Sequence, residues 1–161
     1  LLAKAEGALA GKGLDEAVQR EISGARRKGS NLCLALLDID NFKQINDTHG
    51  HQTGDEALQH LTDVVRENLR PQDSVARYGG EEFIILLPDT LIDSAIAALV
   101  RLQRALTKRF FLARQQKLLI TFSAGVAELK DGEEPEQTID RADKAMYIAK
   151  RSGKNRVLAA R

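Results

Sequence analysis

The sequence has one cysteine, no long apolar run and almost no net charge, and each shortage excludes a class of protein. A single cysteine, Cys33, cannot form a disulfide within the chain, which agrees with a reducing compartment. No apolar stretch approaches the roughly 20 residues that span a bilayer, and no signal-peptide pattern is present. The 24 basic residues nearly balance the 23 acidic ones, which argues against nucleic-acid binding driven by bulk charge. We therefore expect a cytoplasmic domain that contacts neither nucleic acid nor membrane.

The length of the chain fits one domain of ordinary size, spanning residues 1–161. A domain this long buries roughly 70% of the surface that its unfolded chain exposes, so it can fold without disulfides or a structural metal. Because the sequence does not begin with Met, we expect it to be a piece of a longer protein. Such a protein could be anchored to a membrane through its other segments.

The apolar pattern predicts an α+β fold. Helical spacing of apolar residues predicts helices over 14–27, 42–48, 53–69, 92–110 and 138–151. The continuous apolar run over 31–39 predicts a buried central strand. Further strands are predicted over 74–78, 81–87, 118–129 and 156–160, and the third of these could pair with 111–115. The order β-α-α-β-β-α-β predicts helices that cover a mainly antiparallel sheet.

Acidic residues stand at the ends of two of these strands. Asp38 ends the central strand, and Glu81 and Glu82 follow Gly79-Gly80, where glycine tolerates the positive φ of a tight hairpin turn. If the hairpin pairs with the central strand, Asp38 and one glutamate could hold a divalent cation such as Mg²⁺. The alternative is that Asp38 is only a solvated or capping residue, which is the commoner role of an acid at a strand end.

Four segments resemble the GGDEF domain family. RYGGEEF at Arg77–Phe83 is similar to its signature in the GGEEF variant, and LLDIDNFKQINDTHGHQTGDEAL at Leu36–Leu58 is similar to its metal- and guanine-binding segment. FSAGVA at Phe122–Ala127 and RADKAMYIAKRSGKNRV at Arg141–Val157 resemble two later family segments. The likeness extends from about residue 31 to residue 157.

The resemblance implies a palm-like fold related to nucleotidyl cyclases, with a sheet of about five strands. It implies a diguanylate cyclase, which condenses two GTP molecules into cyclic di-GMP and releases pyrophosphate. The implied cofactors are two Mg²⁺ or Mn²⁺ ions per active site. The implied partners are GTP, cyclic di-GMP as product and inhibitor, a second copy of the chain in a homodimer, and an upstream sensory or regulatory domain.

Residue roles follow from the resemblance position by position. Asp38, the carbonyl of Ile39 and Glu81 match the metal site, and Glu81 and Lys43 match the catalytic positions. The residues that match the substrate site are Phe42, Lys43, Asn46, His51, Asp55, Gly79, Gly80, Lys150 and Lys154. Asp55 suits its role chemically, because a carboxylate can accept from guanine N1–H and the 2-amino group, and adenine offers neither donor. Lys154 stands where the family often has Arg. A lysine at this position keeps the positive charge but loses the two-pronged geometry of a guanidinium.

A second implied site concerns regulation. Arg70-Pro71-Gln72-Asp73 matches the RxxD motif of the family's inhibitory product site, and Arg101 matches that site's second arginine. Arginine forks suit phosphate and guanine edges. An ordinary helix terminus would also explain the RxxD string.

The chain departs from the family pattern near its start. Residues 1–13 are expected to be a degenerate lead-in. The stretch that matches the usual DxLTGLxNR segment is AKAEGALAGKGL at Ala3–Leu14, and it lacks the acid, the Thr and the Asn-Arg pair. This favours one alternative, a catalytically silent receptor for cyclic di-GMP or GTP. An adenylate cyclase of the same fold is a second alternative, and Asn46 and Asp55 argue against it. Zinc at His49 and His51 is disfavoured, because residues two apart face opposite ways on a helix.

Overall fold

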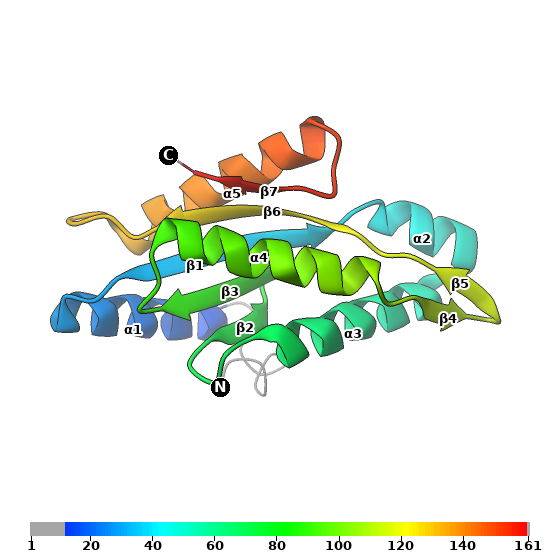
Figure 1. Ribbon diagram of the computed structural model, residues 1–161, viewed down its shortest axis with the longest axis horizontal. Helices are drawn as coiled ribbons and strands as arrows, with labels where there is room; N and C mark the ends of the chain where they lie inside the picture. The colour runs from blue at the N-terminus through cyan, green and yellow to red at the C-terminus, as the bar shows by residue number, and fades with distance from the viewer. Residues whose placement is uncertain (1–11, 161) are drawn as a thin grey trace.

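The computed structural model describes residues 12–160. Its helices are α1 (Lys12–Lys28), α2 (Phe42–His49), α3 (His51–Asn68), α4 (Ile92–Thr107) and α5 (Pro135–Arg151). Its strands are β1 (Leu32–Ile39), β2 (Ser74–Arg77), β3 (Glu82–Pro88), β4 (Phe111–Ala113), β5 (Gln116–Leu118), β6 (Phe122–Glu128) and β7 (Val157–Ala159), as Figure 1 shows. Most of the predicted lead-in, residues 1–11, lies outside the described residues. None of the described helices is both long enough and apolar enough to cross a membrane.

The central sheet has five strands in the order β2-β3-β1-β6-β7. All neighbours are antiparallel except β6 and β7, which confirms the predicted α+β fold with a mainly antiparallel sheet. β1 is the middle strand and is paired on both sides by β3 and β6. The predicted central strand and the β2–β3 hairpin are therefore confirmed.

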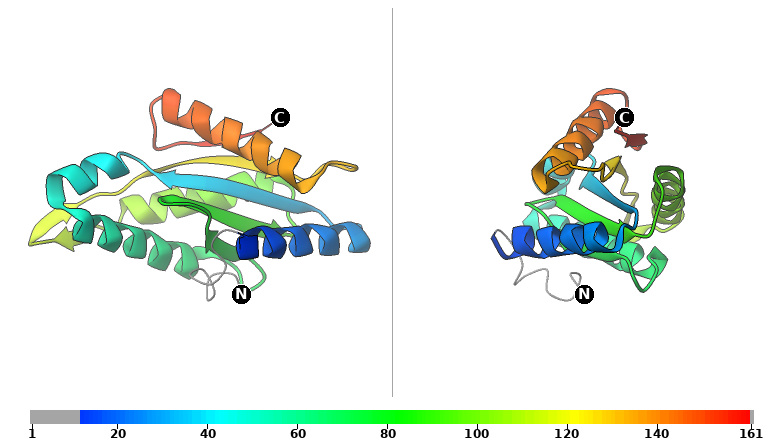
Figure 2. Two further views of the ribbon diagram at one scale, coloured as in Figure 1. Left: turned by 180° about the vertical axis from the view of Figure 1, so that it is seen from behind. Right: turned by 90° about the vertical axis from the view of Figure 1, so that its left-hand side faces the viewer.

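Helices cover both faces of the sheet, and β1 contributes to both cores. Leu34 and Leu36 pack toward α1 and α5, whereas Ala35 and Leu37 pack toward α3 and α4. Successive side chains of a strand point to opposite faces, so a strand that is buried on both sides must be apolar throughout. Figure 2 shows α1 and α5 on one side of the sheet and α4 on the other.

The helix α5 lies unusually close to β6. A Cβ added to Gly125 in β6 would lie 2.0 Å from the backbone oxygen of Ala142 in α5, so only glycine permits this approach. The N-terminus of α5 is also fixed, because Glu134 and Gln137 form a capping box. Nearby, Arg141 forms a largely buried ion pair with Glu133, and this guanidinium holds the pKa of Glu133 at about 2.

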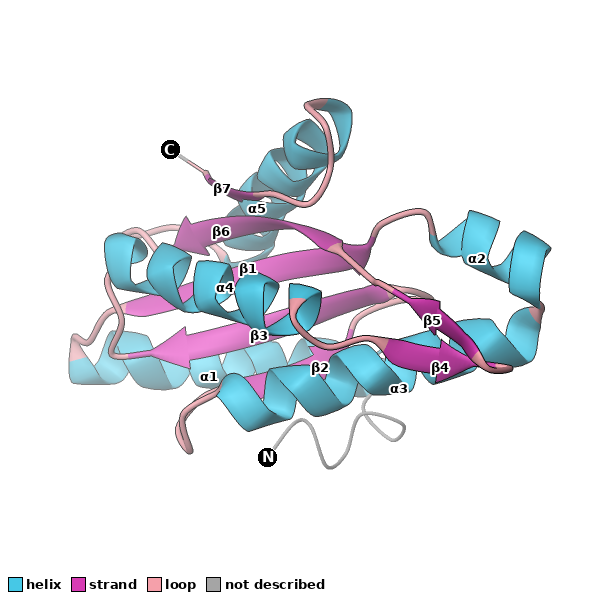
Figure 3. Cartoon of the chain, turned by 45° about the vertical axis from the view of Figure 1, so that its right-hand side comes forward, coloured by secondary structure: helices cyan, strands magenta, loops and turns pink. Residues whose placement is uncertain are grey.

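The predicted strand over 118–129 is in fact two strands. Leu118 belongs to β5, which pairs with β4 in a separate two-stranded sheet, and β6 begins only at Phe122. The predicted pairing with the 111–115 segment is thus right, but the single long strand is wrong. β1 ends at Ile39, and the chain then turns into α2, so Leu119–Thr121 have no residue of β1 to pair with. Figure 3 shows this small hairpin at one end of the molecule, beside α3.

Candidate active site

The C-terminal end of β1 brings together the acidic residues that the sequence singled out. Asp38 pairs in register with Glu82 of β3 on one side and with Ser123 of β6 on the other. Its side chain is only 16% exposed. Its Oδ1 atom is buried and has no hydrogen-bond partner. Burial raises the pKa of Asp38 to about 7, against the opposing effect of the Lys150 charge, and the Glu81 charge raises it further.

The two glutamates of the hairpin face different spaces. Glu81 lines a cleft beside Ile39, whereas Glu82 lines a separate cavity of about 410 Å³ that is bordered by Val18 of α1 and Asp143 of α5. The sequence left open which glutamate accompanies Asp38. The structure places Glu81 on the cleft, in agreement with the family resemblance.

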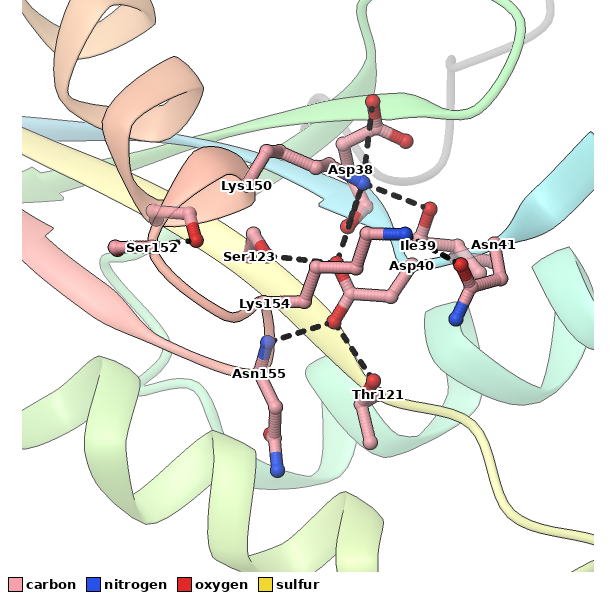
Figure 4. Close-up of polar contacts among 11 residues, drawn as sticks. Asp38, Ile39, Asp40, Asn41, Thr121, Ser123, Lys150, Ser152, Lys154 and Asn155 are labelled. Atoms are coloured by element: carbon pink, nitrogen blue, oxygen red, sulfur yellow. Dashed lines mark hydrogen bonds and ion pairs between the residues drawn. The ribbon is translucent and has the colours of Figure 1, made fainter.

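The ammonium of Lys150 lies beside the oxygen atoms at the C-terminal end of β1. The Nζ atom of Lys150 lies 3.0 Å from the carbonyl oxygen of Ile39 and 3.5 Å from that of Asp38. It also lies 3.2 Å from Oδ1 of Asp40 and 3.7 Å from Oδ2 of Asp38. Figure 4 shows Lys150 reaching from α5 across the end of β1. The site therefore attracts a cation through both a main-chain carbonyl and carboxylates.

The donor set fits a hard divalent cation. Asp38 offers an oxygen that nothing else satisfies, and the Ile39 carbonyl already faces a positive charge. Oxygen ligands of this kind are those that Mg²⁺ and Mn²⁺ prefer. Residues 12–160 contain no group of three or more His, Cys, Asp or Glu side chains arranged for a metal.

A cleft of about 470 Å³ adjoins this end of β1. Its lining comes from the β1–α2 junction, the hairpin and the end of α5, and consists of Ile39, Asn41, Phe42, Lys43, Gln44, Asp47, Glu81, Lys150 and Lys154. The three lysines of this lining give it a positive charge suited to phosphates. The N-terminus of α2 opens into it, and Asn41 before the helix makes no side-chain capping bond, so the first N–H groups of α2 remain available to an anion.

The lysines of the cleft differ in how firmly they are held. Lys43 is 90% exposed and pairs with Asp47 at 3.1 Å. Lys154 donates to the side-chain oxygen of Asn41. Lys150 is 23% exposed and has the several contacts described above. Lys150 is therefore the most firmly held of the three, whereas Lys43 and Lys154 each make one such contact on the surface.

The residues expected to bind guanine lie on α2 and α3, outside the lining of this cleft. Asn46 packs on Gly54, where an added Cβ would lie 1.8 Å from Oδ1 of Asn46. Asp55 follows Gly54, and both Asp55 and His51 are exposed. Gly54 is thus a positioning residue that the sequence reasoning did not identify, although a glycine inside a helical pattern is a recognisable signal.

The Gly79-Gly80 turn does not have the predicted backbone. Neither glycine has a positive φ, so the expected left-handed conformation is wrong. The carbonyl of Gly80 instead accepts hydrogen bonds from the guanidinium of Arg77, which stabilises a wider turn. A Cβ added at Gly80 would meet nothing within 4 Å. The space around Gly80 in the fold therefore does not require a glycine there.

The residues of the predicted product site do meet in space. Arg70, Asp73 and Arg101 line one pocket of about 170 Å³. Asp73 accepts from the main-chain N–H of Arg70 at 2.9 Å and from its guanidinium at 3.2 Å and 3.0 Å. The same guanidinium donates to the hydroxyl of Thr90 at 2.7 Å. Arg70 is thereby fixed in place and remains 45% exposed.

The structure also identifies Asp40, to which the sequence reasoning assigned no role. Its side chain is 1% exposed and contacts β6, α5 and the chain after α5. A signal was present, because Asp40 stands two residues beyond Asp38 and residues two apart along an extended chain point to the same side.

Comparisons with known proteins agree with this geometry. The family described as "Diguanylate cyclase, GGDEF domain" matches residues 11–156. Diguanylate cyclase DgcP of Pseudomonas aeruginosa is 42% identical over 147 residues, which cover 91% of this chain and 22% of DgcP. The response regulator PleD of Caulobacter vibrioides is 39% identical, over 90% of this chain and 32% of PleD. The chain thus spans about a fifth to a third of the length of these two relatives.

A solved structure agrees in fold. The GGDEF domain of DgcB from Caulobacter crescentus, crystallised in complex with cyclic di-GMP, is 38% identical with a TM-score of 0.89, and the match covers 94% of this chain and 90% of that one. Fold and site thus define an α+β domain with carboxylates and lysines gathered at the end of its middle strand. The chain belongs to the GGDEF family.

Proposed function

We propose that this domain is a diguanylate cyclase, which joins two GTP molecules into cyclic di-GMP. The observation that carries the proposal is the cleft at the end of β1, where Glu81 and the carbonyl edge at Ile39 face Lys150 and Lys154. Carboxylates and a carbonyl for cations, beside lysines for phosphates, are the groups that phosphoryl transfer requires. The relatives named as diguanylate cyclases and the DgcB domain bound to cyclic di-GMP support the same activity.

The reaction needs two copies of the domain, each holding one GTP. The 3′-hydroxyl of one GTP attacks the α-phosphorus of the other, the bond from that phosphorus to the bridging oxygen breaks, and pyrophosphate leaves. A second, equivalent step closes the ring and releases a second pyrophosphate. A dimer with twofold symmetry suits this reaction, because each site supplies half of a symmetric product.

The residues of the cleft have different roles in the proposed reaction. Lys150 and Lys154 bind the triphosphate, and Lys43 neutralises charge that develops in the transition state. Asp38, the Ile39 carbonyl and Glu81 would hold the divalent cations, which would supply charge to lower the pKa of the attacking hydroxyl and to balance the phosphates. Glu81 also takes up the proton that the 3′-hydroxyl loses.

Selection of GTP and inhibition by product use the two remaining groups of residues. Asn46 and Asp55 bind the guanine edge, with His51 beside them. Arg70, Asp73 and Arg101 bind cyclic di-GMP in a pocket that is distinct from the cleft, so product inhibition is allosteric. A catalytically silent receptor for cyclic di-GMP or GTP is the second candidate, favoured by the missing DxLT-type residues near the start of the chain.

The deciding experiment is to incubate the protein with GTP and Mg²⁺ and to identify the nucleotide products by mass spectrometry. We expect cyclic di-GMP and pyrophosphate, at a rate that rises roughly with the square of protein concentration when dimers are scarce. Fusion of a leucine zipper before Leu1, with several linker lengths, should make the dependence first order and raise the rate per chain. Absence of product from every fusion, with GTP binding confirmed, would instead favour the silent receptor.

A further inference from the structure

We infer that Asp40 is a positioning residue for the triphosphate, which holds Lys150 and the Lys154–Asn155 turn where they can bind the phosphates. This inference rests on the proposed function. Asp40 itself contacts neither the cation nor the nucleotide in this proposal. It acts only through the residues that it hydrogen-bonds.

The carboxylate of Asp40 is fully used inside the protein. Its Oδ1 atom accepts from the hydroxyl of Ser123 at 2.6 Å and lies 3.2 Å from Nζ of Lys150. Its Oδ2 atom accepts from the hydroxyl of Thr121 at 2.7 Å and from the main-chain N–H of Asn155 at 2.8 Å. A carboxylate has about four acceptor positions, and all of them face protein donors. Asp40 therefore differs from Asp38, which has an oxygen to spare.

Asp40 fixes the turn that carries Lys154. Both Lys154 and Asn155 have left-handed backbones, with φ of 62° and 47°, which residues other than glycine rarely adopt without support. The bond from the Asn155 N–H to Asp40 is one support, and the bond from the Lys154 N–H to the carbonyl of Ala149 is another. This turn directs the Lys154 side chain to Asn41 at the rim of the cleft, as Figure 4 shows.

The same carboxylate gives Lys150 a contact that does not depend on the metal ligands. The other contacts of its ammonium are the carbonyls of Asp38 and Ile39 and the carboxylate of Asp38. Of these, the carbonyl of Ile39 and the carboxylate of Asp38 are groups that a divalent cation would take over in the proposed reaction. Once they turn to the cation, Asp40 is the remaining charged contact that keeps Lys150 beside the phosphates. One buried anion thus supports two of the three lysines of the cleft.

The test replaces Asp40 by Asn, which keeps the shape of the side chain but removes its charge. The probes are α,β-methylene-GTP, which cannot release pyrophosphate, and GMP, which lacks the β- and γ-phosphates, each measured by calorimetry with Mg²⁺. We expect Asp40→Asn to weaken binding of the triphosphate about tenfold or more, since charge-assisted contacts to it are lost, and to leave binding of GMP within about twofold. Asp140→Asn is the matched control. Asp140 also pairs with a lysine of α5, Lys144, but both side chains of that pair are far more exposed. It should change neither affinity.

A double-mutant cycle tests whether Asp40 acts through Lys150. If it does, adding Asp40→Asn to Lys150→Met should cost clearly less than Asp40→Asn costs in the parent. Should Asp40→Asn fail to fold, Ser123→Ala and Thr121→Val each remove one donor to the carboxylate, and each should weaken triphosphate binding selectively, by about two- to fivefold.

Three results would overturn the inference. Equal weakening of GMP and triphosphate would indicate a general structural role for Asp40, and full additivity in the cycle would show that it does not act through Lys150. Unchanged triphosphate affinity in a variant, with normal binding by the parent, would refute the inference alone. If the parent itself fails to bind the triphosphate, the proposed function fails as well.

Discussion

Two aspartates, Asp38 and Asp73, differ in whether the protein alone satisfies them. Asp73, in the Arg70 pocket, is 3% exposed, and three donor atoms of Arg70 hydrogen-bond to it. Asp38, at the end of β1, is 16% exposed and has a buried oxygen with no partner. Its pKa of about 7, raised mainly by burial, reflects how poorly that charge is compensated. The Arg70 pocket is thus complete without a ligand, whereas the end of β1 is incomplete.

The difference has a functional meaning. A complete pocket such as that of Arg70 and Arg101 can bind a ligand with little rearrangement, because its arginine is already fixed. An incomplete site such as that of Asp38 gains most from a bound cation, because the cation satisfies an oxygen that the fold leaves bare. We expect changes at the two sites to affect different measurements: turnover at the end of β1, and folding stability together with product binding at Arg70.

The largest expected effect is on turnover. Glu81→Gln should reduce cyclic di-GMP formation by about a thousandfold or more, because a neutral amide oxygen is a poor Mg²⁺ ligand and a poor proton acceptor. The fold should persist, since Glu81 lies at the turn before β3 and outside the buried core. The checks are product quantification and circular dichroism. Undiminished turnover by the folded variant would remove Glu81 from the mechanism.

The next largest effect is on the free energy of unfolding, through the ion pair of the Arg70 pocket. Arg70→Ala leaves the buried carboxylate of Asp73 without its ion pair and should lower the free energy of unfolding by roughly 1–3 kcal/mol, since Arg70 is 45% exposed and the main-chain N–H at position 70 still donates to Asp73. The double change Arg70→Ala with Asp73→Ala removes that stranded charge, so it should be more stable than Arg70→Ala alone. Denaturant titration measures both.

The same double variant tests the regulatory assignment. It should lose tight cyclic di-GMP binding and product inhibition, while GTP binding stays as in the parent. Calorimetry with each nucleotide gives both affinities. Unchanged affinity for cyclic di-GMP in the folded double variant would refute the assignment of this pocket.

The smallest effect concerns base selection, away from both aspartates. Asp55→Ala should narrow the preference for GTP over ATP by roughly 1–3 kcal/mol, because guanine would lose the acceptor for its N1–H and 2-amino donors. Because Asp55 is exposed on α3, the substitution should leave the stability of the fold unchanged. Calorimetry with GTP and ATP gives the ratio, and an unaltered ratio would mean that another residue selects the base.

The local sequence was sufficient for most of the fold. The uninterrupted apolar run predicted a strand buried on both faces. The predicted range, 31–39, starts one residue before β1 and ends with it. The error at 118–129 has a tertiary cause: Leu119–Thr121 have strand-like composition, but β1 ends before it can pair with them. The type of a residue indicates whether it is suited to a strand. Whether it forms one also depends on an adjacent strand to pair with, which only the tertiary structure provides.

For the site, the sequence by itself determined which chemical groups are available and where along the chain they stand. It identified Asp38, Glu81 and Lys150 through motif resemblance, and a motif is a local property. Only the tertiary structure showed that Glu81 and Glu82 line two different spaces, and that the ammonium of Lys150 lies on the Ile39 carbonyl. It alone showed that the carboxylate of Asp40 is satisfied by four donors, from Thr121 just before β6, from β6 itself, from α5 and from the turn after α5. The physical reason is that hydrogen bonding and desolvation depend on what surrounds an atom in space, and residues more than 80 positions apart in the chain supply those surroundings here.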